Sequence, residues 1–193
     1  FATLQPIMFV LLFNYVFGGA IGAALPPGVS YAQFLIPGIM VQTIVFGSSA
    51  TSVGLADDLQ KGIIDRFRSL PIARSAVLGG RITADTVRLT AVAVVLVVVG
   101  FLVGFRFEGG PGMGLLMIVV AVAFGSAMCW IMANIGMGVK DPETAQTAGF
   151  VWLFPLTFVS SVFTPVYTMP DWLQPIARNT PVTLVANLLR ALS

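Results

Sequence analysis

The charged side chains between positions 57 and 88 are the residues whose types and spacing could do chemistry. Six of the ten Lys and Arg residues and four of the eight acidic residues fall in this segment. They are Lys61, Arg66, Arg68, Arg74, Arg81 and Arg88, with Asp57, Asp58, Asp65 and Asp85. Mixed charges of this kind form ion pairs, within a chain or with another protein. Long apolar runs lie on both sides, so we expect the segment in water and its flanks in lipid.

Residues 62–70 can form two turns of an amphipathic helix. Ile63, Phe67 and Leu70 stand at i, i+4 and i+7 on one face, and Pro71 ends the helix. The charged side chains point elsewhere. The residues alone leave two interpretations open. The apolar face could dock in a groove of another protein, or the helix could lie on lipid headgroups that attract its arginines.

A second constellation is Arg81, Asp85 and Arg88, whose spacings of four and three put them on one helix face, where they can pair. We interpret these residues as a solvated helix entry with snorkelling arginines, in preference to a catalytic site.

Several kinds of chemistry lack their usual residues. The chain has no histidine, so zinc, haem and His-based acid–base sites lose their usual ligand and base. Cys129 is the single cysteine, which excludes an internal disulfide and favours a packing role. Neither a phosphate-binding loop nor a Gly-x-Ser-x-Gly motif occurs. We also expect no carboxylate inside a span, where coupled carriers usually place one. These features predict no catalytic residues, no metal, no cofactor on this chain, and energy supplied from outside the bilayer.

Composition identifies an integral membrane protein. The 193 residues are 57% hydrophobic and 9% charged, with a mean hydropathy of +0.95, whereas soluble domains carry about 25% charged residues. The basic balance of +2 is not interleaved with exposed aromatics, so nucleic acid is not an expected partner.

The predicted fold is all-α, a single polytopic transmembrane domain over residues 1–193. Since a span takes roughly 20 helical residues, five spans are visible, at about 1–24, 33–56, 84–105, 113–139 and 144–165. The third is rich in Val, but a lone strand cannot satisfy its backbone in lipid, so we predict a helix. The chain begins inside one apolar run and stops after an amphipathic stretch, so we expect both ends to be truncated.

The predicted loops are 57–83 and 140–143 on one side and 166–193 on the other. Loops after the second and fourth spans hold seven Lys and Arg residues against three elsewhere, which predicts that 57–83 and 140–143 are cytoplasmic and 166–180 outside. Residues 166–193 contain Tyr167, Trp172 and several prolines, a pattern typical of interfacial helices. Thr180 and Pro181 predict a helix start there.

Several motifs together resemble permease subunits of type-2 ATP-binding cassette exporters, close to the daunorubicin-resistance drug-efflux permeases. The motifs lie at residues 34–39, 57–58 with 61–74, 79–81, 163–166, 169–173 and 179–183. The central run is the most specific, and the match covers nearly the whole chain.

This resemblance implies six spans, the sixth following Ser193, and a loop between spans two and three that forms a coupling helix on a separate ATPase subunit. ATP and Mg would bind to that partner, and two permeases, identical or paralogous, would work together. Short outer helices would correspond to Asp171–Arg178 and Pro181–Leu192. The implied docking residues are Asp57, Asp58, Lys61, Gly62, Ile63, Asp65, Arg66, Phe67, Arg68, Leu70 and Pro71.

Similar exporters hold substrate between two permeases, which suggests Gln42, Phe46, Phe154 and Phe158 as contacts for a flat amphiphile. Ordinary packing or lipid-facing roles are at least as good an interpretation of these four. The leading functional prediction is ATP-driven export of amphiphilic drugs or lipids across a bacterial cytoplasmic membrane, with drug resistance as a consequence. The alternatives are export of a lipid-linked glycan or envelope lipid, a scaffold or channel without energy coupling, and an intramembrane enzyme.

Overall fold

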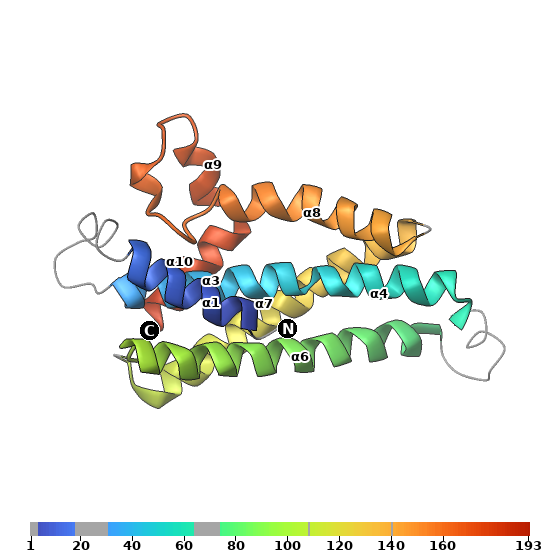
Figure 1. The fold of residues 1–193 in the computed structure, drawn as a ribbon, viewed down its shortest axis with the longest axis horizontal. Helices are drawn as coiled ribbons and strands as arrows, with labels where there is room; N and C mark the ends of the chain where they lie inside the picture. The colour runs from blue at the N-terminus through green and yellow to red at the C-terminus, as the bar shows by residue number, and fades with distance from the viewer. Residues whose placement is uncertain (1–3, 18–30, 64–73, 108, 140) are drawn as a thin grey trace.

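The computed structural model describes residues 4–17, 31–63, 74–107, 109–139 and 141–193. All regular structure in these ranges is helical, which confirms the all-α prediction. The long helices lie side by side along one axis (Figure 1). The elements are α1 (Leu4–Leu12), the π-helical η1 (Phe13–Phe17), α3 (Tyr31–Gly47), α4 (Ser49–Gln60), α6 (Arg74–Val103), α7 (Gly110–Gly138), α8 (Pro142–Phe158), the 3₁₀ turn η2 (Val166–Thr168), α9 (Gln174–Asn179) and α10 (Pro181–Ala191).

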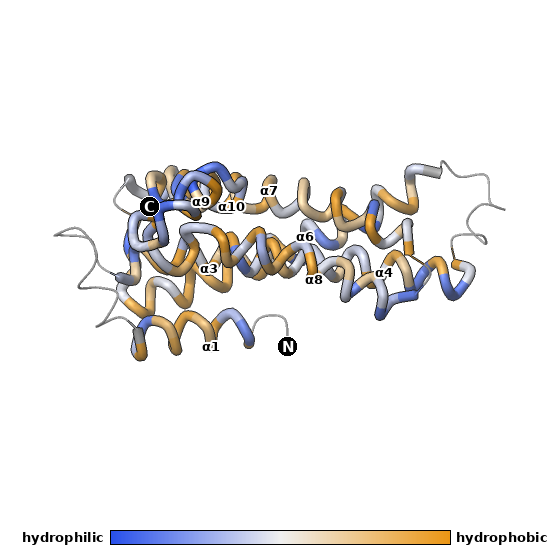
Figure 2. Tube along the Cα trace, turned by 90° about the horizontal axis from the view of Figure 1, so that it is seen from above, coloured by the Kyte–Doolittle hydropathy of each residue, from blue (hydrophilic) through white to orange (hydrophobic). Residues whose placement is uncertain are grey.

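The bundle has two distinct ends. In Figure 1, α3 and α4 run in line through the middle, with α6 on one side and α8 on the other. At one end α4 finishes and α6 and α8 begin, and we call this the α4–α6 end. At the other, the α9–α10 end, the short helices and the C-terminus gather beside the start of α3. Figure 2 shows hydrophilic segments toward both ends and mostly apolar helix between them.

Three segments are long and apolar enough to cross a membrane: Tyr31–Gln60, Ser75–Val103 and Gly110–Gly138. Their 29 or 30 residues correspond to about 44 Å at 1.5 Å per residue, more than the roughly 30 Å of a hydrocarbon core. The first is 67% buried inside the protein along its apolar window, against 33% for the other two. This segment, α3 and α4 together, is therefore the central element around which the others pack.

Two helices do not coincide with the predicted spans. α6 begins at Arg74, before the third predicted span at about 84; since a helix can extend beyond the hydrocarbon core, that span boundary stays a prediction. α8 ends at Phe158, short of the 165 predicted for the fifth span, because Val159 leaves helical geometry, with φ −89° and ψ 56°. The first span is described as α1 and η1, and its predicted end lies outside the described residues.

The rod formed by α3 and α4 is interrupted at Ser48. The Thr51 amide donates to the Ser48 carbonyl at 3.0 Å, one residue closer than in an α-helix. The Ser48 hydroxyl donates back to the Val45 carbonyl at 2.6 Å. The Gly47 carbonyl is thereby left for a partner from another helix.

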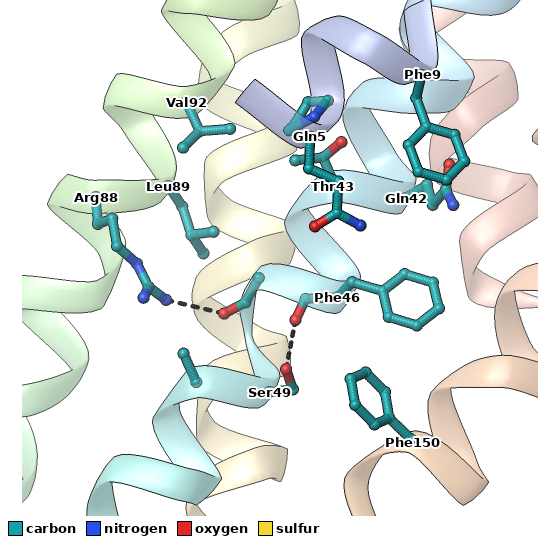
Figure 3. Close-up of a pocket in the computed structure, with 13 residues that line it drawn as sticks. Gln5, Phe9, Gln42, Thr43, Phe46, Ser49, Arg88, Leu89, Val92 and Phe150 are labelled. Carbon is teal, nitrogen blue, oxygen red and sulfur yellow. Dashed lines mark hydrogen bonds between the residues drawn. The ribbon is translucent and has the colours of Figure 1, made fainter. Parts of the chain in front are cut away.

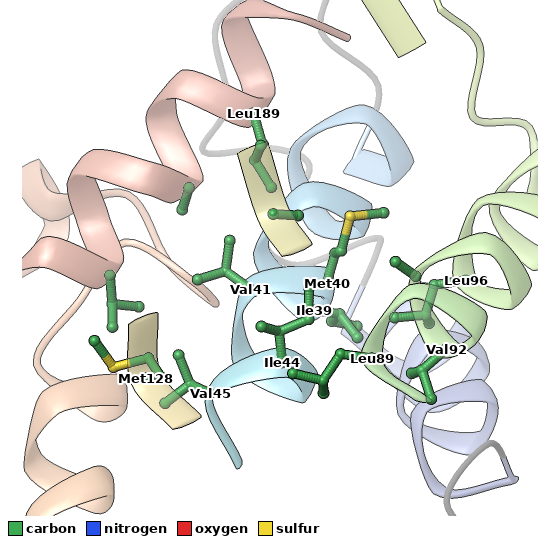
Figure 4. Close-up of a cluster of buried hydrophobic side chains, with 14 of the residues drawn as sticks. Ile39, Met40, Val41, Ile44, Val45, Leu89, Val92, Leu96, Met128 and Leu189 are labelled. Atoms are coloured by element: carbon green, nitrogen blue, oxygen red, sulfur yellow. The ribbon is translucent and has the colours of Figure 1, made fainter. Parts of the chain in front are cut away.

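The hydrophobic core surrounds α3. Figure 4 shows side chains from α3, α6, α7 and α10 meeting in one cluster, with α3 contributing the largest share. The labelled members are Ile39, Met40, Val41, Ile44, Val45, Leu89, Val92, Leu96, Met128 and Leu189. Cys129 is buried beside this cluster, in agreement with the predicted packing role.

Glycines allow α7 to approach α3 and α4 closely. A Cβ atom on Gly136 would lie 2.5 Å from the Ser52 carbonyl oxygen of α4. A Cβ on Gly125 would overlap the side chain of Ile44 on α3. Backbone-to-backbone packing of this kind is how membrane helices associate without a hydrophobic driving force between them.

Two helix starts are capped as elementary chemistry predicts. The Asp141 carboxylate accepts hydrogen bonds from the Thr144 hydroxyl and from the Thr144 amide, each at 2.7 Å, and begins α8. These bonds, the hydroxyl's more than the amide's, lower the pKa of Asp141. The Thr180 hydroxyl accepts from the Thr183 amide and begins α10 with Pro181 at the first position. Two short helices, α9 and α10, lie where the family resemblance placed them, and their outer side stays a prediction.

Arg190 joins α10 to α3 and to the bend after α8. Its guanidinium lies 3.7 Å above the Phe34 ring. Its nitrogens donate to the Phe34, Ser161 and Val162 carbonyls, the Ser161 hydroxyl and the Asn187 side chain. These five bonds match the five N–H groups that a guanidinium has. Burial lowers the pKa of Arg190 to about 10, so it stays charged at neutral pH.

Candidate functional site

The predicted docking segment is only partly described. Its described members lie at the end of α4 and just beyond it: Asp57, Asp58, Lys61, Gly62 and Ile63. The remaining ones lie outside the described residues: Asp65, Arg66, Phe67, Arg68, Leu70 and Pro71. The docking face formed by Ile63, Phe67 and Leu70 therefore stays a prediction.

The described part of this segment presents charge at the α4–α6 end. Lys61 Nζ lies 2.7 Å from Asp57 Oδ2, one helical turn away, and this hydrogen bond raises the pKa of Lys61. Gly62 follows with a φ of +66°, a left-handed conformation that glycine adopts without strain and that ends α4. Asp57 and Lys61 thus remain at the surface, where a partner could reach them.

Asp58 and Arg81 instead pair with each other in a partly buried position between α4 and α6. Arg81 Nη1 lies 3.2 Å from Asp58 Oδ2, and Arg81 Nε lies 3.4 Å from Asp85 Oδ2. Arg81 also donates to the Ala50 carbonyl at 3.3 Å. Gly54 leaves the space for this side chain, because a Cβ there would overlap the guanidinium. Asp58 therefore links α4 to α6, whether or not it contacts a partner.

Asp85 is the centre of this network, and the interpretation of a solvated helix entry is wrong for it. The residue is 6% exposed. Thr51 donates to its Oδ2 at 2.7 Å, and Arg88 Nη2 lies 3.3 Å from its Oδ1. These contacts hold the carboxylate between α4 and α6. Asp85 also lies within the helix Ser75–Val103, which is long and apolar enough to span a membrane, so the expectation that no carboxylate lies inside a span is wrong.

Arg88 connects the network to the break in the central rod. Its Nη2 donates to the Gly47 carbonyl at 2.9 Å, the carbonyl that the turn at Ser48 leaves without its usual helical partner. In Figure 3 this bond is the dashed line that starts at Arg88. Two arginines and two aspartates, Arg81, Arg88, Asp58 and Asp85, thus form a chain of contacts from the end of α4 to the middle of the bundle.

A pocket of about 290 Å³ opens beside Arg88, between α1, α3, α4, α6 and α8 (Figure 3). It has an apolar side with aromatic rings and a side with neutral polar groups and one guanidinium. The lining residues are Gln5, Pro6, Phe9, Gln42, Thr43, Phe46, Gly47, Ser49, Ala50, Arg88, Leu89, Val92 and Phe150. Its size and mixed lining are typical of small-molecule sites.

The structure separates the four predicted substrate contacts into two groups. Gln42 and Phe46 line the pocket. Phe154 and Phe158 do not, but they continue its aromatic side along α8: the Phe46 and Phe154 ring centroids are 5.3 Å apart, and those of Phe154 and Phe158 are 5.5 Å apart. Phe163 then stacks near Phe158 and Phe13. The rings form one continuous surface from α3 to the bend after α8.

Sequence reasoning missed several lining residues. Gln5 and Phe9 lie on α1, and Phe150 lies on α8, in stretches where only apolar character was informative. Arg88 was singled out for pairing but not for a pocket. Its position about four turns inside a helix that is otherwise apolar toward Val103 is the signal that could have found it.

The arrangement suits binding rather than bond-breaking. In the described ranges no three His, Cys, Asp or Glu side chains come together as a metal site. The carboxylates near the pocket are already bonded to arginine or threonine. What remains is an amphipathic pocket held against a charge network that reaches the α4–α6 end.

Comparison with known proteins decides the family. The profile of the ABC-2 type transporter family matches residues 1–192. The chain belongs to this family. The resemblance noted from the motifs is thereby confirmed, and the pocket and the charge network are features of the membrane domain of an ABC-2 type transporter.

Two curated relatives of this ABC-2 family member are similar over most of its length. It is 36% identical to the daunorubicin resistance ABC transporter permease protein DrrB1 of Streptomyces coeruleorubidus, over 98% of this chain and 66% of the relative. It is 24% identical to the doxorubicin resistance ABC transporter permease protein DrrB of Mycobacterium tuberculosis, over 97% of this chain and 64% of the relative. The chain spans about two thirds of the length of these relatives.

Proposed function

We propose that this chain is the membrane subunit of an exporter that moves small amphiphilic molecules out of a bacterial cell, powered by a separate ATPase subunit. Family membership supports the ABC type of transporter. The names of these two relatives refer to daunorubicin and doxorubicin resistance, which supports drugs as the exported molecules. The observation that carries the proposal is the amphipathic pocket, which lies within reach of the charge network leading to the α4–α6 end.

The proposed direction of coupling runs from the α4–α6 end to the pocket. This end lies in the cytoplasm in our proposal, because the lysines and arginines of residues 57–83 favour that side. An ATPase bound there displaces the end of α4 or the start of α6. Asp58, Arg81 and Asp85 would transmit this displacement to Arg88, which holds the broken rod at Gly47.

A second permease is part of the proposal. Large apolar side chains are exposed along α1 and α8, on the two helices that flank the pocket: Leu4, Met8, Leu11, Leu12, Val151, Trp152, Phe154 and Phe158. Packing two such faces together would remove this surface from lipid and enclose the pocket. The pocket volume favours a small amphiphile over the alternative cargo, a lipid-linked glycan.

The substitution Phe67→Asp tests the coupling step. A carboxylate on the predicted apolar docking face should abolish substrate-stimulated ATP hydrolysis and vesicle transport of a fluorescent amphiphile, while membrane insertion is unchanged. The matched control is Gln60→Asp, which adds the same charge at the exposed end of α4 outside the docking face. Normal stimulation and transport in Phe67→Asp would overturn the proposal.

A further inference from the structure

The pocket lining contains one charged side chain, and it is basic. Of the thirteen described residues that line it, only Arg88 is charged; Gln5, Gln42, Thr43 and Ser49 are neutral and polar, and the rest are apolar or glycine. None of these described lining residues is a carboxylate. The nearest one, on Asp85, is buried and already bonded to Thr51 and two arginines. A positively charged ligand would therefore find no counter-charge here, whereas a negatively charged one would.

Arg88 has hydrogen-bond donors left over for such a ligand. Its Nη2 serves the Gly47 carbonyl and Asp85, but its Nε and Nη1 have no hydrogen-bond partner in the part of the chain that the structure describes. Its side chain is 40% exposed. Arg190, by contrast, uses all five N–H groups on the protein itself. The free Nε and Nη1 lie on different sides of the guanidinium, so each can donate one charge-assisted hydrogen bond to a carboxylate, phosphate or sulfonate oxygen.

The position of Arg88 along the bundle suits the headgroup of an amphiphile. The largely apolar stretch of α6 from Leu89 to Val103 begins directly after it and is roughly 22 Å long. Arg88 thus lies at the boundary between this apolar stretch and the charge network. The rings of Phe9, Phe46 and Phe150 line the pocket on its other side (Figure 3). An acidic group at Arg88 would leave the rest of the molecule against these rings.

We propose that this pocket is selective for anionic amphiphiles, with one acidic group bound by Arg88 and an apolar or aromatic body packed on Phe9, Phe46 and Phe150. Gln42 and Thr43 supply neutral hydrogen bonds beside the acidic group. The inference rests on the proposed function and names its substrate class. The acidic group belongs either to a free amphiphilic acid or to an anionic phospholipid, because both present the same chemistry to the guanidinium.

The test compares two ligands of one shape and opposite charge. The full chain is placed in phosphatidylcholine nanodiscs, and binding of 9-anthracenecarboxylate and of 9-(aminomethyl)anthracene is followed by anthracene fluorescence. We expect the anion to bind at least about tenfold more tightly than the cation, the size of one charge-assisted contact. Equal affinities, or tighter binding of the cation, would overturn the proposal.

Arg88→Gln should remove this preference and leave the two anthracenes within about twofold of each other. Arg106→Gln is the matched control, because Arg106 is exposed at the other end and, among the described residues, donates hydrogen bonds to the carbonyls of Phe101 and Phe105 alone. It should keep the preference. If Arg88→Gln does not fold, Thr43→Leu fills the pocket without touching the charge network and should weaken binding of both ligands at least fivefold. A preference unchanged in Arg88→Gln, or affinities unchanged in Thr43→Leu, would contradict the assignment.

The source of the acid is decided by replacing part of the phosphatidylcholine with phosphatidylglycerol. Competition with 9-anthracenecarboxylate in the wild type but not in Arg88→Gln assigns the site to a lipid headgroup; absence of competition assigns it to a free acid. Both support an anionic ligand. Because these measurements need no ATPase, a failed charge preference leaves the proposed export testable by ATP hydrolysis, and a failed coupling leaves the binding result intact.

Discussion

Two arginine sites, near opposite ends of the bundle, neutralise their charge in different ways. Near the α4–α6 end, Arg81 and Arg88 share the carboxylates of Asp58 and Asp85. At the α9–α10 end, Arg190 has no carboxylate partner among the described residues and is held by carbonyl, hydroxyl and amide oxygens and by the Phe34 ring. The first site can exchange one ionic partner for another, whereas the second is held by groups fixed in the backbone.

This difference in bonding indicates which of the two sites can change its geometry. Salt bridges between side chains tolerate changes of distance, since the charges attract over several ångströms. Hydrogen bonds to backbone carbonyls lose their energy within a fraction of an ångström. We therefore interpret the Arg190 site as a fixed anchor for α10 and the Asp85 network as an adjustable contact between α4 and α6.

The largest expected effect is on the fixed anchor. Arg190→Met should lower the free energy of unfolding by about 3–5 kcal/mol, because it leaves buried carbonyl groups without donors. Arg190→Lys should recover only part of this, since an ammonium offers three donors instead of five. Reversible unfolding in mixed micelles measures both, with Arg106→Met as the exposed control. If the Arg190→Met protein is as stable as the control, Arg190 does not anchor α10.

The adjustable network should respond less strongly and should show compensation. Asp85→Asn should cost about 2–3 kcal/mol, because two arginines lose their shared carboxylate in a buried site. Adding Arg88→Gln removes one of the uncompensated charges, so the double variant should be more stable than the sum of the singles by about 1 kcal/mol. Strict additivity in this double-mutant cycle would show that the residues do not act together.

The smallest expected effects on stability come from replacing the glycine that lies beside each arginine site. A Cβ on Gly38 would overlap the Val162 carbonyl and lie 3.2 Å from Arg190 Nη2, and backbone cannot move aside. Gly38→Ala should therefore cost about 2 kcal/mol. A Cβ on Gly54 would meet only the flexible side chain of Arg81, so Gly54→Ala should displace that arginine at less than about 1 kcal/mol. Equal costs in the same unfolding assay would remove the distinction between a fixed and an adjustable site.

The sequence predicted features that depend on neighbouring residues or on overall apolarity. The helix start at Thr180 and Pro181 follows from local capping chemistry, and the buried Cys129 follows from its apolar run. The family could be recognised because its motifs are short and contiguous. Gln42 and Phe46 were expected to face a ligand because the family resemblance placed them there, and the structure puts both in the pocket lining.

What the sequence could not supply depends on contacts between distant residues. Asp85 looked solvated because its contact with Thr51, 34 positions away, and the space that Gly54 leaves for Arg81 are invisible in a linear pattern. The anchor joins Arg190 to Phe34 across 156 positions, and nothing in the local composition of α10 indicates that partner. The pocket likewise draws its lining from five helices, and only their packing brings these residues together.

The contact between Gly136 and Ser52 has a mechanical consequence. Where two helix backbones touch directly, no flexible side chain lies between them to absorb a displacement. We therefore expect α4 and α7 to move together as one rigid unit, without sliding or rotating against each other. The rod of α3 and α4 together with α7 would then serve as the frame against which other helices swing. Opening and closing would then be a movement of α6, which packs on that frame through apolar side chains such as Leu89 and Leu96 and is tied to it by ion pairs at Asp58 and Asp85.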